Sequence, residues 1–214
     1  MAFLTKVPGV GQFMTITVDG MKVPGIQQEK LEDCGPSCVG LVLRMARYDG
    51  ADTITPANLR AASQLSVGGY RPAVDDVVQE APSPAMHALA AIMKGAIGGR
   101  GTGTYAVGLV AMLQDQYGYK KAQLRNLNSA LGFGDLSTPT LAKPVIAHVA
   151  WEGGGGHWSV VCGYRAGMLL YSDPYYGVGW LNFQVETVGG IKQPKYVPQI
   201  GARGHFSGTV ISIA

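Results

Sequence analysis

Residues 28–45, QEKLEDCGPSCVGLVLRM, decide the fold because they place a cysteine at the expected start of an amphipathic helix. Asp33 is a good N-cap, and Pro36 fits the first helical turn, where no backbone N–H donor is needed. Apolar residues then recur at helical spacing, and Asp49-Gly50 predicts where the helix stops. The unpaired N–H groups and the dipole at such a helix start favour the thiolate of Cys34, which is the nucleophilic form of cysteine.

A second informative stretch begins near residue 143, where the pattern changes from helix to strand. Apolar runs at 144–151, 157–164 and 168–172 predict strands, and the turn at 165–167 makes the last two a hairpin. Helices therefore come first and antiparallel strands follow. This order predicts an α+β fold rather than alternating β–α–β units.

The N-terminal part predicts a hairpin. The dipeptide Asp19-Gly20 supplies the positive-φ residues of a tight turn between extended runs at 15–18 and 21–23, and Pro24-Gly25 predicts its end. We expect this hairpin to form an N-terminal extension over residues 1–25.

Further helices are predicted to start at Thr55-Pro56 and to cover 85–97 and 104–117. The glycine-rich segment 98–103 is interpreted as a connection, because a phosphate-binding loop would need a preceding strand and a following Lys-Ser/Thr. The chain has 214 residues without a repeat or a clear linker, which predicts a single domain over 1–214.

Composition excludes several classes of protein. Charged residues make up 14% of the chain, well below the usual ~25%, so a charged disordered tail and a coiled coil are both disfavoured. The net charge of +3 forms no basic stripe, which argues against nucleic-acid binding. We find no signal peptide and no apolar run long enough to span a membrane, so no membrane partner is expected. Three cysteines are too few for a disulfide framework and suit a reducing compartment.

The strand hairpin supplies partners for the cysteine. His157 opens one strand and Asp173 closes the next, so the two ends come close across the antiparallel pair. A nucleophilic cysteine needs a base, and the base needs an orienting group. The other histidines fit this role less well: His87 and His148 lie in apolar segments, and no carboxylate or amide side chain follows His205.

These segments together resemble a known family. Gln28 with Asp33-Cys34-Gly35-Pro36-Ser37-Cys38, then the run 143–149, then 157–164 and Asp173-Pro174 are similar to the motifs of papain-like cysteine peptidases. The group most like this chain is the bacterial one that cuts bacteriocin leader peptides after a double glycine. The resemblance covers roughly residues 24–185 and implies a papain-like fold, with the nucleophile helix packed on a C-terminal antiparallel sheet.

The resemblance also implies the roles of individual residues. Cys34 would be the nucleophile, His157 the general base and Asp173 the group that orients the imidazole. Gln28 would donate to the oxyanion together with the backbone N–H of Cys34, and Gln27 is the alternative for this role. The implied reaction is hydrolysis of a peptide bond in a protein substrate, with a preference for Gly-Gly, and it needs no cofactor and no metal.

The chain departs from the leader peptidases because it carries no transporter and because 85–140 is rich in Ala and Gly. A stand-alone chain of this kind also resembles bacterial effectors that contact-dependent systems such as type VI secretion inject into other cells. That setting implies a toxin kept in the bacterial cytoplasm before delivery, a protein target in the recipient cell and a cognate immunity protein in the producer.

Other interpretations remain open. The same triad serves deamidation, acyl transfer and cleavage of peptidoglycan amides, and an inactive peptidase scaffold would act as a binding module. Cys34 and Cys38 are four residues apart and could bind a metal with His157 or Cys162, although a zinc site normally has a second close ligand pair. For Cys38 and Cys162 we expect core packing instead.

Overall fold

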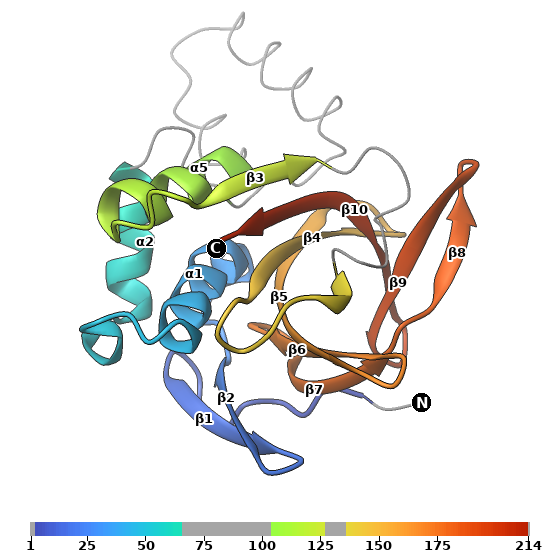
Figure 1. Cartoon of the computed structure of the whole chain (residues 1–214), viewed down its shortest axis with the longest axis horizontal. Coiled ribbons are helices and arrows are strands. Elements are labelled where there is room, and N and C mark those ends of the chain that lie inside the picture. The colour runs from blue at the N-terminus through green and yellow to red at the C-terminus, as the bar shows by residue number, and fades with distance from the viewer. Residues whose placement is uncertain (1–2, 66–103, 127–135, 214) are drawn as a thin grey trace, which may run out of the picture.

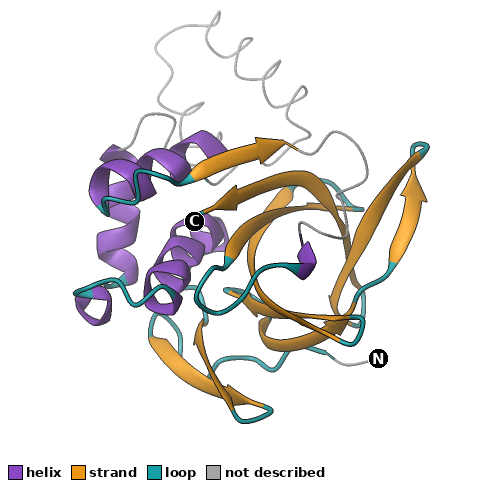
Figure 2. Ribbon diagram, viewed as in Figure 1, coloured by secondary structure: helices purple, strands orange, loops and turns teal. Residues whose placement is uncertain are grey.

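A computed structural model describes residues 3–65, 104–126 and 136–213 of the chain (Figure 1). The predicted helix at 85–97, His87 and the glycine-rich segment 98–103 lie outside these residues. The described part has mixed α/β architecture, with helices on one side and a large curled antiparallel sheet on the other (Figure 2).

Strands from the C-terminal half build the sheet. Its order is β7-β6-β5-β4-β10-β9-β8, and β3 pairs with the far end of β10. The strands of this sheet are β3 (Gln123–Asn126), β4 (Val145–Trp151), β5 (Gly156–Arg165), β6 (Met168–Asp173), β7 (Gly177–Asn182), β8 (Val185–Val188), β9 (Ile191–Gln199) and β10 (Ala202–Ser212). The strands β4, β5, β6 and β7 are consecutive in the sequence and adjacent in the sheet, and short turns connect them.

The remaining elements precede this sheet in sequence. They are a separate hairpin of β1 (Phe13–Val18) and β2 (Met21–Ile26), short 3₁₀ turns at η1 (Leu31–Asp33) and η2 (Ala51–Thr53), and the helices α1 (Cys34–Met45), α2 (Pro56–Leu65) and α5 (Ala106–Ala111), the last continued by a π-helical turn, η3 (Met112–Gln116). Among the described residues, no helix combines the length and the apolar character needed to cross a membrane.

Helix α1 lies at the centre of the helical side and is buried almost all round. It packs against β5 on one side and against α2, α5 and the β1–β2 hairpin on the others (Figure 1). Gly40 permits this crowding, because a Cβ there would overlap the Phe13 ring and the Leu59 side chain. The missing side chain thus lets α1 pack closely against both β1 and α2.

The alternation of side chains along the strands gives the sheet two apolar faces. In β5, Val160 and Cys162 belong to the core shared with α1, whereas Val161 belongs to a second core enclosed by the curl of the sheet. Tyr171, Tyr196 and Phe206 fill this second core together with smaller aliphatic side chains. His157 has the same parity as Val161, so it faces the enclosed side.

Several predicted boundaries need correction. Strand β2 does not end at Pro24-Gly25: it runs to Ile26, and Pro24 pairs with Thr15. Helix α1 ends at Met45 rather than near Asp49-Gly50, because Arg47 adopts a left-handed φ of 55° and the Tyr48 N–H closes onto the Leu43 carbonyl. The turns at Asp19-Gly20 and 165–167 and the helix start at Pro56 are confirmed. The segment 104–117 is helical over 106–116.

Candidate active site

Cys34 is the first residue of α1 and lies where the helical side meets the sheet. Its side chain is 6% exposed, whereas Cys38 and Cys162 are 0% and 1% exposed. Cys34 lies close enough to His157 to help raise the pKa of the imidazole. The structure thus brings together the cysteine and the histidine that the sequence singled out.

His157 and Asp173 are joined directly. The imidazole Nε2 lies 2.6 Å from the Asp173 Oδ2, and both side chains are buried. Val160 pairs with Ser172 across β5 and β6, which places Asp173 beside Ser159 and diagonal to His157 on the same face. Because Nε2 faces Asp173, Nδ1 is the nitrogen available to Cys34.

The carboxylate of Asp173 is fully buried and receives further hydrogen bonds. The backbone N–H groups of Tyr175 and Tyr176 donate to Oδ1 at 2.8 and 2.7 Å. The hydroxyl of Tyr196, on β9, donates to Oδ2 at 2.5 Å. These bonds offset the cost of burying an anion. No short-range pattern in the sequence points to Tyr196, because β9 reaches this site only through its pairing with β10 in the curled sheet.

Electrostatics favour a charged His157–Asp173 pair. Burial alone would raise the pKa of Asp173, but the charge and hydrogen bond of His157 and the bonds from Tyr196 and Tyr176 lower it overall. Burial likewise lowers the pKa of His157, but the charge and hydrogen bond of Asp173, followed by those of Cys34, raise it to about 10. At neutral pH the pair is therefore an imidazolium beside a carboxylate.

Gln28 is buried and is separated from the end of β2 by Gln27 alone. Its backbone N–H donates to the carbonyl of Pro174 at 2.7 Å, which ties it to the residue after Asp173. Its side-chain amide donates to the Lys30 carbonyl at 2.6 Å. Gln28 therefore sits beside the His–Asp pair, with one amide N–H already engaged. Gln27 is half-buried, and its carbonyl accepts from Gly11.

Two other histidines have different surroundings. His148 is half-buried, lies against the Trp158 ring at 4.8 Å and shares a hydrogen bond with Ser207. Burial first, and then the charge of His157, lower the pKa of His148 to about 4, so it is neutral at pH 7. His205 does have a carboxylate partner, Glu186, which precedes it in the sequence. No carboxylate or amide side chain follows His205 in the sequence, but the upstream Glu186 supplies its partner.

Asp33 does not cap the helix as predicted. It occupies the N-cap position of α1, but its side chain makes no capping hydrogen bond there. Its Oδ2 instead pairs with the Arg60 guanidinium of α2 at 2.5 Å and accepts from the Lys30 N–H at 3.3 Å. Arg60 also bridges to Glu29 at 2.7 Å. Burial raises the pKa of Asp33, although Arg60 counteracts this.

Cys38 and Cys162 are buried in the core beneath the site. Burial raises the pKa of both thiols, and the Cys162 thiol contacts the Leu170 carbonyl. Both therefore have the surroundings of packing residues. Among the described residues, His157 and these cysteines do not form a group whose ligand atoms lie close enough together to hold one metal ion.

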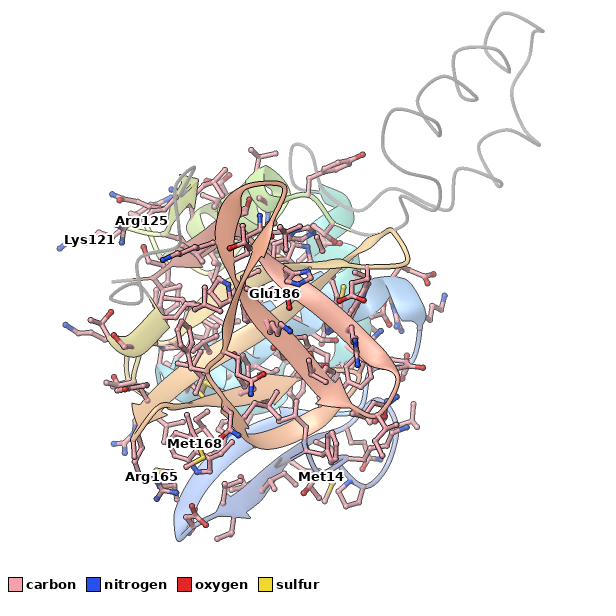
Figure 3. All side chains as sticks on the ribbon, turned by 90° about the vertical axis from the view of Figure 1, so that its right-hand side faces the viewer. Met14, Lys121, Arg125, Arg165, Met168 and Glu186 are labelled. Carbon is pink, nitrogen blue, oxygen red and sulfur yellow. The ribbon has the colours of Figure 1, made fainter. Side chains whose placement is uncertain are left out.

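In the described part of the chain, the one group with metal-ligand geometry is Glu152, Glu186 and His205. Figure 3 faces the β8–β9 hairpin, on which Glu186 is labelled. The ammonium of Lys195 already pairs with Glu186, so the charge of this carboxylate is compensated without a metal.

Aromatic side chains wall the His–Asp pair. The Trp151 ring stacks on the His157 imidazole with centroids 5.6 Å apart, and Tyr176 meets the imidazole edge-on at 6.0 Å. On the other side, the Trp158 indole N–H donates to the Thr104 carbonyl, and Thr104 lies against Gly35, next to Cys34. Behind these contacts, His157 and Cys34 are equally little exposed, at 6% each. A buried thiol, imidazole and carboxylate in this order can perform nucleophilic acyl transfer.

Comparison of the chain with protein-family models and with curated proteins finds no match. The geometry of the residues themselves is therefore what bears on function.

Proposed function

We propose that this chain is a cysteine-type peptidase of papain-like fold that cleaves a protein substrate with Cys34, His157 and Asp173. One observation carries the proposal: His157 Nε2 lies 2.6 Å from the buried Asp173 carboxylate, and Cys34 is near enough to the same imidazole to help raise its pKa. In this proposal the nucleophile lies at the start of a helix, and the base and its partner lie on two paired strands. The sequence resemblance implies the same arrangement.

In the proposed reaction, the Cys34 thiolate attacks the carbonyl carbon of the scissile bond. The backbone N–H of Cys34 and the Gln28 amide are proposed to stabilise the resulting oxyanion, a contribution typically worth about 2.7–4 kcal/mol per donor. The His157 imidazolium gives its proton to the leaving amine, and a thioester forms. His157 then takes a proton from water, which hydrolyses the thioester and frees Cys34. Asp173 keeps the imidazole oriented throughout.

The first test is the rate at which each cysteine reacts with iodoacetamide between pH 4 and about pH 9, with the modified sites identified by mass spectrometry. We expect Cys34 to react much faster than Cys38 and Cys162, and we expect its reactivity at low pH to be lost in His157→Ala. His148→Ala is the matched control, because His148 is the nearby neutral histidine. Equal reactivity of the three cysteines, or no effect of His157→Ala, would contradict the proposal.

The substrate and bond type need a second assay. Incubation with peptides that contain Gly-Gly, followed by mass spectrometry, should give fragments with the wild type and none with Cys34→Ala. A small mass gain of a glutamine-containing target without any new fragment would point to deamidation instead. If Cys34→Ala matches the wild type in every assay, the chain is a binding module on a peptidase scaffold.

We further propose an antibacterial effector role with a protein target in the recipient cell, which rests on the sequence resemblance alone. Expression in a susceptible bacterium should slow growth, and Cys34→Ala should relieve this effect. Equal growth of the two strains would remove the effector role but leave the peptidase proposal standing.

A further inference from the structure

The two oxygens of the Asp173 carboxylate have different partners. Oδ1 accepts from the backbone N–H groups of Tyr175 and Tyr176, so the turn after β6 fixes the carboxylate against rotation. Oδ2 accepts from His157 at 2.6 Å and from the Tyr196 hydroxyl at 2.5 Å. The imidazole and the phenol thus share a single oxygen atom.

Burial and ring packing fix the side chain of Tyr196 beside Asp173. It is 0% exposed and lies on β9, which pairs with β10 on the side away from β4, and it is 23 residues from Asp173 in the sequence. Its ring packs against Tyr171 at 5.2 Å, Phe206 at 5.7 Å and Trp151 at 5.9 Å. Close aromatic packing restricts the phenol, so its hydroxyl is aimed at Oδ2.

We propose that Tyr196 is a positioning residue that acts through Asp173 and limits how strongly the carboxylate holds the proton of His157. The inference rests on the proposed function, because it concerns the same His–Asp pair. A carboxylate oxygen that already accepts one strong hydrogen bond carries less charge for a second donor. Tyr196 therefore leaves His157 a better acid toward the leaving amine than an unshared carboxylate would.

The charged and titratable groups around the pair come from several elements. Cys34 and Cys38 approach from α1, His148 from β4, Tyr176 from the turn after β6, and Tyr196 from β9 with Tyr171 beside it. Burial and the neighbouring Asp173 raise the pKa of Tyr196 well above its ordinary value, so its hydroxyl remains a donor at any pH at which the protein works. His148 is neutral at pH 7 and adds no opposing charge there.

The test is titration of the His157 imidazole by nitrogen NMR in histidine-labelled protein, wild type against Tyr196→Phe. Removal of the hydroxyl should raise the midpoint at which His157 loses its proton by about half to one pH unit, a roughly three- to tenfold tighter hold on the proton. Tyr171→Phe is the matched control, since it removes a neighbouring buried hydroxyl, and it should leave the midpoint within about a tenth of a unit. An unchanged or lowered midpoint in Tyr196→Phe would overturn the proposal.

A second variant covers the case in which Tyr196→Phe does not fold. Incorporation of 3-fluorotyrosine at position 196 keeps the ring and the hydroxyl but makes the hydroxyl a stronger donor, so the His157 midpoint should fall. A midpoint that rises or stays fixed here would also overturn the proposal. The NMR readout needs no substrate: a shift without any peptidase activity would fault the proposed function and leave the role of Tyr196 intact.

Discussion

At the scale of single residues, the molecule buries two opposite charges beside each other, an imidazolium on His157 and a carboxylate on Asp173. Burial disfavours the charged form of both groups, and the largest opposing effect on each is the charge of the other. Removal of one partner therefore leaves an uncompensated buried charge and lowers stability. Trp151 and Tyr176 hold the imidazole between aromatic surfaces, and the turn after β6 holds the carboxylate. The geometry around His157 and Asp173 therefore depends on backbone hydrogen bonds and packing as well as on the pair itself.

The His–Asp pair makes stability depend on pH in a predictable direction. The pKa of His157 rises from its ordinary value of 6.5 to about 10 on folding, so its contribution is fully present below pH 6.5 and is lost as pH rises toward 10. The lowered pKa of Asp173 gives a contribution present above its ordinary 3.8 and lost in stronger acid. The pair is therefore most stabilising between pH 3.8 and 6.5.

Urea unfolding of the wild type and Asp173→Asn from pH 5 to about pH 8.5 checks this prediction. The free energy of unfolding of the wild type should exceed that of Asp173→Asn by most near pH 5. This difference should decrease above pH 6.5, by about 1.4 kcal/mol per pH unit at most. Tyr171→Phe serves as the control, because burial raises the pKa of this tyrosine and its hydroxyl is uncharged over the whole range. An advantage that stays constant or grows with pH would contradict a raised His157 pKa.

At the scale of elements, the sequence predicted local structure well and contacts between distant strands poorly. The Asp19-Gly20 turn, the start of α1 and the β5–β6 hairpin follow from local chemistry, and the hairpin was enough to bring His157 to Asp173. Tyr196 and the Glu186–His205 pair depend on how β8 and β9 add to the sheet, which no short-range pattern specifies. Asp33 was misassigned for the same reason, since its partner Arg60 is 27 residues away.

The Arg60–Asp33 ion pair ties α2 to the start of α1. Asp33 is 1% exposed, so Arg60→Ala leaves a buried carboxylate without its cation and should cost about 2–3 kcal/mol of unfolding free energy. Lys120→Ala, which breaks an exposed pair with Asp115, is the matched control and should cost under about 0.5 kcal/mol. Thermal and urea unfolding measure both values.

The double variant Arg60→Ala with Asp33→Asn separates the charge from the packing. It should recover part of the lost stability, because a neutral amide is less costly to bury than an unpaired carboxylate. If Arg60→Ala costs no more than Lys120→Ala, the ion pair does not hold α2 against the start of α1.

At the scale of the whole molecule, the N-terminal segment joins the two sides of the curled sheet. Thr5 exchanges backbone hydrogen bonds with Val178 on β7, and the Leu4 N–H donates to the Pro198 carbonyl on β9 at 3.2 Å. These strands stand on opposite sides of the enclosed core, so the segment bridges the opening between them (Figure 1). The core that it helps to close contains Tyr196, and through that residue the N-terminus supports Asp173.

Gly177 is the position at which this closure is most sensitive. It has a φ of +111°, and a Cβ there would overlap the carbonyl oxygen of Thr5, so Gly177→Ala must push the N-terminal segment off β7. Gly201→Ala is the control, because Gly201 has a φ of +84° and nothing lies within 4 Å of its Cβ. We expect the control to lose about 1 kcal/mol from backbone strain and Gly177→Ala to lose about 3 kcal/mol or more, because overpacking adds to that strain. Faster amide exchange at Val178 in Gly177→Ala but not in Gly201→Ala would show that the hydrogen bond from Val178 to Thr5 is the one lost. Equal losses, with Val178 protected in both variants, would mean that the sheet closes without the N-terminal segment.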